Sequence, residues 1–413
     1  MKLIGLLDCN NFFVSCERLF RPDLMNKPVA VLSSNDGVIV ARSQEVKDMG
    51  VPMGLPLFQA KKLVNMDKIT FFSSNFTLYR DLSDRVMNVL AKEVGKIDIY
   101  SIDEAFFEVE NVSLEELSLL RTRIIKKVGI PVSIGVAATK TLAKEASQIG
   151  KKEEGICLLH QEEWSERALQ TPCGSIWGLG RATVTKLAEL KVTTAGEFMA
   201  LERQFVRKNF GVGGERIYDE LHGVRVHELG SRAHESNKSI MSTRSFAEAS
   251  HNILELQSAV AYHVSQVAIK LRQQQAAATM MHLELRASRH SDFSHRAGGT
   301  EIILDTPTQS TQKLTRLALE AVKKIYDSEI PYKKAGIVVS GLIPEDYVSA
   351  TLFDEQDNKV KDKLDEVLDI VQNRYGFSAL HSAAVLPSHD KSSAKLRSSA
   401  YTTTWKDIPT IRA

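Results

Sequence analysis

The sequence predicts a protein of several domains in the α+β class, and three observations support this. The chain has 413 residues, which is too long for one ordinary core, so we expect domains of roughly 100 to 150 residues each. Strand-like and helix-like segments alternate up to about residue 160, whereas residues 165–232 are a run of short helices punctuated by glycines. From about residue 240 the order becomes strand, helix, strand, strand, helix, strand.

The first region contains six short apolar segments of strand character. They are residues 3–8, 28–33, 36–42, 97–103, 104–110 and 131–137. The segments Ser113–Val128 and Thr141–Ile149 instead repeat apolar side chains at helical spacing, which predicts two helices. This mixture fits either an α+β or an α/β core.

The region 240–345 predicts a split βαβ fold. After a first strand we expect the elements Ile253–Gln275 (helix), Met280–Ser288 and Gly299–Leu304 (strands), Gln312–Tyr326 (helix) and Ala335–Leu342 (strand). The second helix has one apolar face, formed by Leu314, Leu317, Ala318, Ala321, Val322 and Ile325. A polar stretch before this region suits a linker at 233–239. The Ser- and Lys-rich end, from about Pro387, is expected to be weakly ordered.

Composition excludes several classes of protein. Hydrophobic residues make up 43% and charged residues 25% of the chain, and no apolar run is long enough to span a bilayer. The N-terminal apolar run meets Asp8 at once and lacks a small-residue cleavage site, so we interpret it as a strand. Four cysteines without a Cys-x-x-Cys pair fit neither a zinc cluster nor a disulfide framework, which favours the cytoplasm. A net charge of +2 is too mild to argue nucleic-acid binding alone.

Two adjacent carboxylates inside an apolar stretch are the main chemical signal. The segment IDIYSIDEAFFEV places Asp103 and Glu104 between strand-like flanks, and because burying an unpaired carboxylate is costly, something cationic should lie on the pair. Asp8 ends the first strand and joins them if the two strands are neighbours and the chain bends at 103–104. Oxygen donors without histidine or cysteine favour Mg²⁺ over zinc, and two such ions suit an in-line phosphoryl displacement. The alternative is that one carboxylate caps a helix while the others face water.

A Gly-x-Gly turn formed by Gly178 and Gly180 is a second signal. The turn follows an apolar residue and leads into an amphipathic helix, the pattern of a helix-hairpin-helix that offers backbone N–H groups to a DNA phosphate. Such turns are also common as structural loops.

The segment MMHLELRASRH predicts a strand with one buried and one polar face. Met281, Leu283 and Leu285 alternate with polar residues, which places Arg286 on the polar face. Charged residues of this region either follow a phosphate backbone or form a solvated surface, namely Arg286, Arg289, Lys270, Arg272 and Arg296.

The motifs occur in an order that resembles one family. The run DCNNFF from Asp8, then FRPDL, KPVAVLSSNDGVIVARS, EVKDMGVPMG, SIDEAFFEV and IGVAATKTLAKEAS, resembles the Y-family of lesion-bypass DNA polymerases. The triplets RSF near 245, KAG near 335, LFD near 353 and YTT near 402 are similar to its UmuC-type branch. The resemblance covers nearly the whole chain. It implies a right-hand polymerase with a ferredoxin-like palm (1–11 and 75–164), small fingers (12–74), a helix-hairpin-helix thumb (165–232), a βαββαβ little finger (240–345) and a C-terminal partner-binding tail (346–413).

The resemblance also implies roles for residues at the metal site. Asp8 and Asp103 would bridge two Mg²⁺ ions, Glu104 would complete the site that activates the primer 3′-hydroxyl, and the Cys9 carbonyl oxygen would add a ligand. Phe13 falls at the family's aromatic steric gate, which leaves no room for a ribose 2′-hydroxyl. Its alternative is an ordinary core phenylalanine.

Two lysines match positions that bind the dNTP phosphates in the family. Lys151 matches the lysine that contacts the triphosphate, and the alternative is a surface lysine like its neighbour Lys152. Where many relatives carry Tyr-x-x-Arg on the phosphates, this chain has Gln44 and Lys47. Lys47 keeps a point charge for phosphate but lacks the bidentate fork of arginine, and a role for Gln44 is doubtful.

Two C-terminal segments imply partners. The segment ATLFDEQ is similar to a degenerate form of the peptide by which bacterial polymerases bind the sliding clamp. This implies that Leu352 and Phe353 enter an apolar pocket of the clamp, although Ser349 stands where glutamine is usual. The alternative is that the two apolar residues simply pack within the domain. The basic tail, with Lys391, Lys395 and Arg397, is similar to the region through which UmuC-type subunits meet a UmuD′-like accessory dimer and the RecA filament.

Together these features imply an error-prone, template-directed translesion DNA polymerase of SOS mutagenesis that adds dNTPs to a primer on primer-template DNA. One alternative is a nucleotide cyclase with a palm-like core, which would need neither the thumb nor the basic domain. The other is a DNA-binding accessory subunit without catalysis, against which the three carboxylates argue.

Overall fold

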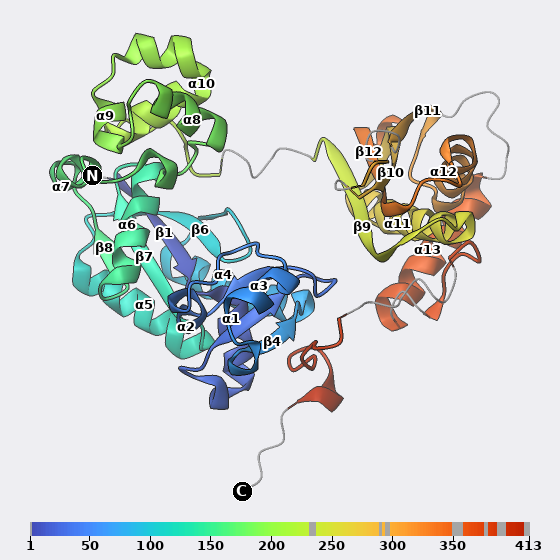
Figure 1. Cartoon of the computed structure of the whole chain (residues 1–413), viewed down its shortest axis with the longest axis horizontal. Coiled ribbons are helices and arrows are strands. Elements are labelled where there is room, and N and C mark those ends of the chain that lie inside the picture. The colour runs from blue at the N-terminus through green and yellow to red at the C-terminus, as the bar shows by residue number, and fades with distance from the viewer. Residues whose placement is uncertain are drawn as a thin grey trace, which may run out of the picture. The chain divides into compact units, whose positions relative to one another are not determined.

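The computed structural model describes residues 2–230, 237–288, 291–293, 298–348, 358–375, 379–385 and 394–408. The chain divides into two compact units, Met1–His234 together with Ala394–Ala413, and Glu235–Ser393 (Figure 1). Among the described residues, no helix is long and apolar enough to cross a membrane.

A five-stranded sheet forms the centre of the first unit. In spatial order its strands are β5 (Ile97–Ile99), β6 (Glu104–Glu110), β1 (Lys2–Cys9), β7 (Val132–Ala137) and β8 (Ile156–Leu158). Strand β1 is antiparallel to both β6 and β7, so β6 and β7 run in the same direction with β1 between them. This is a split βαβ arrangement, as in a ferredoxin-like palm. The predicted segment 97–103 is a strand only to Ile99 and then turns.

Helices cover both faces of this sheet. Helices α4 (Phe76–Val94) and α5 (Leu114–Val128) pack on the face that carries Leu7, and α6 (Lys140–Lys152) packs on the face that carries Leu6. Because side chains alternate along a strand, Asp8 projects from the same face as Leu6, toward α6. The two helices predicted here, α5 and α6, are confirmed, whereas α4 was not predicted.

A smaller three-stranded sheet follows β1 in the chain. Its order is β3-β2-β4, and its elements are β2 (Val29–Leu32), β3 (Ile39–Arg42), β4 (Thr70–Ser73), α1 (Phe12–Phe20), α2 (Gln44–Asp48) and α3 (Leu57–Leu63). Strands β2 and β4 are parallel and β3 is antiparallel to β2. Ser43 caps α2 by accepting a hydrogen bond from the backbone N–H of Val46, which fixes the start of the helix that carries Lys47.

Four helices complete the first unit, as the glycine-punctuated pattern predicts. They are α7 (Gln161–Ala168), α8 (Arg181–Glu189), α9 (Ala195–Met199) and α10 (Arg203–Leu221), the last interrupted at Gly211. Their apolar residues share a core with the α6 face of the five-stranded sheet. The helical module is therefore packed directly on the face that carries Asp8.

The second unit has the predicted βαββαβ order. Its elements are β9 (Ser239–Ser250), α11 (Ile253–Gln273), β10 (Ala276–Ala287), β11 (Gly299–Thr308), α12 (Thr311–Ile325) and β12 (Tyr332–Pro344). The sheet order is β11-β10-β12-β9 with every pair antiparallel, so β12 lies between β9 and β10 and completes a split βαβ. Helices α11 and α12 pack on one face of this sheet.

An additional helix, α13 (Asn358–Tyr375), lies in the stretch that was expected to be only a tail. It is fixed to α11 because the Arg272 guanidinium binds both carboxylate oxygens of Asp369 at 2.7 Å and also faces Asp365. The interpretation of Arg272 as a DNA contact is therefore wrong, since its donors are engaged inside the second unit.

The last described residues, 394–408, pack on the first unit, and we call them the C-terminal strap. The backbone N–H of Ser73 donates to the Leu396 carbonyl oxygen at 3.1 Å, so the strap continues the edge of β4, beside which it is drawn in red (Figure 1). The expectation of a weakly ordered end is wrong for these residues, because buried polar groups of the β4–α4 connection bind to them. Lys391 lies outside the described residues.

Candidate active site

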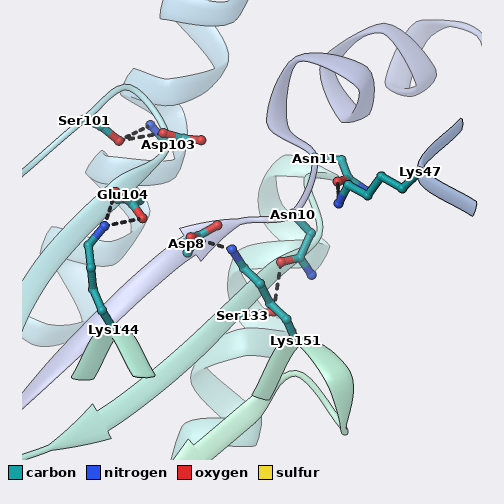
Figure 2. A network of polar contacts seen from close by, with 10 residues as sticks. All are labelled: Asp8, Asn10, Asn11, Lys47, Ser101, Asp103, Glu104, Ser133, Lys144 and Lys151. Carbon is teal, nitrogen blue, oxygen red and sulfur yellow. Dashed lines mark hydrogen bonds and ion pairs between the residues drawn. The ribbon is translucent and has the colours of Figure 1, made fainter. Parts of the chain in front are cut away.

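The end of β1 and the hairpin between β5 and β6 carry the three predicted carboxylates on neighbouring segments (Figure 2). Asp8 is directly opposite Glu104 in the register of the two strands, and the Cys9 N–H donates to the Asp103 carbonyl oxygen at 2.9 Å. A tight turn precedes Glu104, whose carbonyl oxygen accepts from the N–H groups of Tyr100 and Ser101. The chain thus bends at Asp103 and Glu104, which is the condition that the sequence set for the two side chains to share a site.

Each carboxylate has its own partner in this structure (Figure 2). The Lys151 ammonium lies 2.6 Å from Asp8 Oδ2, and the Lys144 ammonium lies 3.0 and 3.1 Å from the two oxygens of Glu104. The Ser101 hydroxyl donates to Asp103 Oδ1 at 2.6 Å. Both lysines come from α6 and are two helical turns apart, so they project from one face of that helix.

Burial dominates the electrostatics of Asp8. Desolvation raises the pKa of the Asp8 carboxyl to about 6 from 3.8, the nearby Lys151 ammonium lowers it, and Glu104 adds to the rise. Burial together with the charges of Asp103 and Asp8 raises the pKa of the Cys9 thiol well above its ordinary value. The thiol therefore stays neutral, and only the backbone of Cys9 offers a ligand oxygen.

The donor set suits a hard cation such as Mg²⁺, because it consists of carboxylate oxygens and a backbone carbonyl. In the described part of the chain, no three acidic, histidine or cysteine side chains converge closely enough to hold a metal ion. The Lys144 ammonium pairs with Glu104 and the Lys151 ammonium pairs with Asp8, so each lysine lies where a metal cation would bind. The raised pKa of Asp8 favours a further positive charge at this position.

Lys47 approaches the same region from α2. Its ammonium donates to the Asn11 side-chain oxygen at 2.6 Å, and Asn11 begins α1 in the left-handed backbone region. Burial lowers the pKa of the Lys47 ammonium, and repulsion from Arg42 and Lys151 lowers it further. Gln44, in contrast, is exposed and donates to Asp48 of its own helix, so it turns away from this cluster of cations.

The adjacent phenylalanines of α1 have different environments. Phe12 belongs to the buried core, whereas Phe13 is only partly buried. The Phe13 ring stacks on Tyr79, with centroids 4.5 Å apart and planes within 14°, and meets Phe76 edge to face. Tyr79 and Phe76 belong to the first turn of α4, so α4 supports the ring of Phe13.

The predicted glycine turn begins α8. Gly178 has a φ of 96°, and a Cβ atom there would lie 2.8 Å from Ile217 of α10, whereas a Cβ on Gly180 would meet nothing within 4 Å. Gly180 is the N-cap of α8 and no side chain caps this end. The first N–H groups of α8 thus remain available to an anion. Gly178 also lines a cavity of about 320 Å³ together with Tyr100, Trp177 and Arg216.

Arg286 lies on the open face of the β10 strand with a side chain that is 55% exposed. It pairs with Glu284, which also binds Lys334 of β12. Lys270 belongs to α11, which covers the opposite face, so it cannot share one surface with Arg286. Four predicted contact residues lie outside the described residues, namely Arg289, Arg296, Leu352 and Phe353.

Sequence reasoning missed three groups that support the site. The Lys144 ammonium forms an ion pair with Glu104 and lies 4.8 Å from the ring centre of Tyr100. The Ser133 hydroxyl donates to the side-chain oxygen of Asn10. Tyr79 supports Phe13. The helical spacing of Lys144 and Lys151 in TLAKEASQIGK was visible in the sequence, whereas the position of Tyr79 depends on the tertiary fold.

Three stretches of the chain match known families. Residues 7–148 match the impB/mucB/samB family, residues 237–352 match the C-terminal domain of that family, and residues 362–411 match a domain of unknown function (DUF4113). ImpB of Salmonella typhimurium is 34% identical, over 99% of this chain and 100% of that protein. UmuC of Salmonella typhimurium (strain LT2) is 32% identical with the same coverage. The solved Y-family DNA polymerase chimera Dbh-Dpo4(243-245)-Dbh aligns with a TM-score of 0.67 and 19% identity, over 83% of this chain and 99% of that chain.

Proposed function

Because the chain belongs to the impB/mucB/samB family, with the right-hand fold of Y-family DNA polymerases, we propose that it is an error-prone translesion DNA polymerase of SOS mutagenesis. The primer 3′-oxygen attacks the α-phosphate of a dNTP chosen by the template, and pyrophosphate leaves. The observation that carries this proposal is that Asp8 and Glu104, from distant parts of the chain, lie opposite each other on neighbouring strands, with Asp103 next to Glu104 and two lysines beside them.

The three carboxylates act as the metal-binding groups. Asp8, Asp103 and Glu104, together with the Cys9 carbonyl oxygen, would be the ligands of two Mg²⁺ ions. Bound Mg²⁺ would supply Lewis-acid activation of the primer hydroxyl and stabilise negative charge on the phosphates. The rigid β1–β6 pairing keeps Asp8 and Glu104 opposite each other, which supports this assignment.

The lysines supply positive charge to the triphosphate. Lys151 moves from Asp8 to the phosphates of the incoming dNTP, and Lys47 adds a second cation from α2. The lowered pKa of Lys47, caused by burial and by its cationic neighbours Arg42 and Lys151, supports a site that gains from a bound polyanion.

Phe13 selects the sugar of the nucleotide. Its partly exposed ring, supported from below by Tyr79, fills the position that the 2′-hydroxyl of a ribonucleotide would need. The small three-stranded sheet would press only loosely on the nascent base pair, which would leave room for a damaged template base.

Backbone and basic groups hold the DNA. The turn formed by Gly178 and Gly180 presents the first N–H groups of α8, which bind a phosphate without reading sequence. Arg286 and Arg289 contact the duplex from the second unit. The corresponding domains are a palm (1–11 and 75–164), fingers (12–74), thumb (165–232), linker (233–239), little finger (240–345) and C-terminal region (346–413).

The partners follow from the family and from the chemistry of the substrate. Primer-template DNA and dNTPs are the substrates, and the reaction takes place in the cytoplasm. A UmuD′-like dimer and the RecA filament act as accessory partners, and Leu352 and Phe353 bind the sliding clamp.

A DNA-binding subunit without catalysis is the second candidate, and the complete set of carboxylates argues against it. A nucleotide cyclase would leave the helical module and the second unit without a role. Primer extension by the Asp103→Asn variant separates these functions. We expect no extension with unchanged affinity for primer-template DNA, because the substitution removes a metal ligand and no DNA contact. The matched control is Asp84→Asn on the exposed face of α4, which should extend normally. Full activity of Asp103→Asn would eliminate the metal assignment.

A further inference from the structure

The C-terminal strap binds the connection that precedes α4. The backbone N–H of Leu396 donates to the Ser73 hydroxyl, and the Asn75 side-chain amide donates to the carbonyl oxygens of Ser398 and Ser399 at 3.2 Å. Asn75 is fully buried and is also the N-cap of α4. The strap thus provides partners for the polar groups that fix where α4 begins.

A second set of contacts leads from the strap to α1. The Ser398 hydroxyl donates to Glu17 at 3.1 Å, and the Tyr79 hydroxyl donates to the same carboxylate oxygen at 2.6 Å. Glu17 has no exposed surface. Farther along the strap, the ring of Tyr401 stacks on Phe20 at the end of α1, with centroids 4.6 Å apart.

The contacts of Ser398 lead to Phe13, whereas Tyr401 packs on Phe20 of α1, the helix that carries Phe13. Tyr79 stacks on Phe13, and the first turn of α4 also supplies Phe76, which meets the edge of the Phe13 ring. A line of direct contacts therefore runs from Ser398 through Glu17 and Tyr79 to Phe13. Because packed interiors transmit strain, a change at Ser398 would be expected to shift the ring through these contacts.

We propose that the C-terminal strap positions the aromatic gate, and that Ser398 and Tyr401 are positioning residues for sugar selection. The strap lies within residues 362–411, which match a domain of unknown function, and the inference gives a role to its last part. It rests on the proposed function in one respect, the assignment of Phe13 as the gate.

The physical reason is the cost of a buried carboxylate. Burial raises the pKa of Glu17, and the hydroxyl groups of Tyr79 and Ser398 lower it by donating to the charged form. Loss of the Ser398 hydroxyl leaves one donor, so Glu17 becomes easier to protonate or must reorient. Either response disturbs the hydrogen bond that holds Tyr79 under Phe13.

The test compares insertion of a ribonucleotide and a deoxyribonucleotide by full-length variants. Ser398→Ala and Tyr401→Ala should each raise the ratio of ribonucleotide to deoxyribonucleotide kcat/KM by about three- to tenfold. The conservative variants Ser398→Thr, which keeps the hydroxyl, and Tyr401→Phe, which keeps the stacked ring, should have the same ratio as the wild type. Trp405→Ala is the matched control, because this strap residue is 89% exposed and should not change sugar selection.

Phe13→Ala separates failure of this inference from failure of the gate assignment. If Phe13→Ala admits ribonucleotides while Ser398→Ala and Tyr401→Ala keep the normal ratio, the gate stands and the positioning role of the strap is wrong. If Phe13→Ala leaves the ratio unchanged, the gate assignment fails and the inference fails with it. Equal thermal unfolding of Ser398→Ala and Ser398→Thr would show that a changed ratio does not come from general unfolding.

Discussion

Replacing Asp8 with asparagine should separate catalysis from stability, because the two depend on the Asp8 charge in opposite ways. Burial raises the pKa of Asp8 to about 6 from 3.8. The carboxyl group therefore ionises less easily in the folded protein than in the unfolded chain, and the ionised carboxylate lowers the stability of the folded state. Asparagine has the shape of the protonated acid and never ionises. We therefore expect Asp8→Asn to abolish primer extension and to stabilise the first unit.

The size and pH dependence of this gain follow from the pKa. A rise from 3.8 to about 6 corresponds to about 3 kcal/mol of destabilisation when the group is ionised in both states. The gain from asparagine should be about 1 to 3 kcal/mol, since Lys151 loses part of its attraction in the variant. This gain is largest above pH 6, shrinks as the pH falls, and disappears below about 3.8, where both states are protonated.

Thermal unfolding between pH 4 and 8 would measure the effect on the wild type and the variant. The melting temperature of Asp8→Asn should exceed that of the wild type by several degrees at pH 8, and the two values should converge near pH 4. Asp84→Asn, on an exposed surface, should show neither difference. A melting temperature that is unchanged, or raised equally at every pH, would refute burial of the Asp8 charge as the cause.

Two further predictions concern the phosphate and DNA contacts. Lys151→Ala should raise the KM for dNTP about tenfold at low salt, because it removes a cation from the triphosphate, whereas Lys152→Ala should change the KM little. Equal effects of the two substitutions in steady-state kinetics would contradict the assignment of Lys151. Gly178→Ala should lower the free energy of unfolding by about 1 to 3 kcal/mol, since an alanine at this φ is strained and its Cβ would crowd α10. Gly180→Ala, where the space is open, should be nearly neutral in urea unfolding, and a reversed order would be incompatible with this geometry.

The repeating patterns of the sequence predicted most of the second unit. Each of its predicted helices and strands overlaps an observed element, because alternation and helical periodicity are strong there. Helix α4 was missed although Leu78, Leu82, Val86 and Leu90 recur every four residues and Asn75 is a favourable N-cap. That signal was present and was obscured by the charged residues on the outer face of the helix.

The C-terminal strap could not be predicted by the same reasoning. Its residues are mostly small and polar, and they form no periodic apolar face. What orders the strap is a set of buried partners more than 300 residues away in the chain, such as Ser73 and Asn75, whose unsatisfied groups are invisible in a single sequence. The weakly ordered end was thus a reasonable expectation from composition, and long-range hydrogen bonds overturn it.

The sequence indicates that buried carboxylates need positive partners, and in the structure lysine side chains are these partners. The adjacent acids Asp103 and Glu104 in an apolar stretch required a positive partner, and in this structure Lys144 of α6 provides it for Glu104. Asp103 accepts from the Ser101 hydroxyl, and Lys151 from the same face of α6 pairs with Asp8. Such ion pairs lower the cost of burying the acids, and Lys151 in particular stays partly exposed, with 29% of its side chain accessible. A side chain with access to solvent can leave Asp8 when a polyanion offers it a better partner. Under the proposed function, the same lysine would stabilise the free protein and then bind the phosphates of the substrate, provided that another cation compensates Asp8.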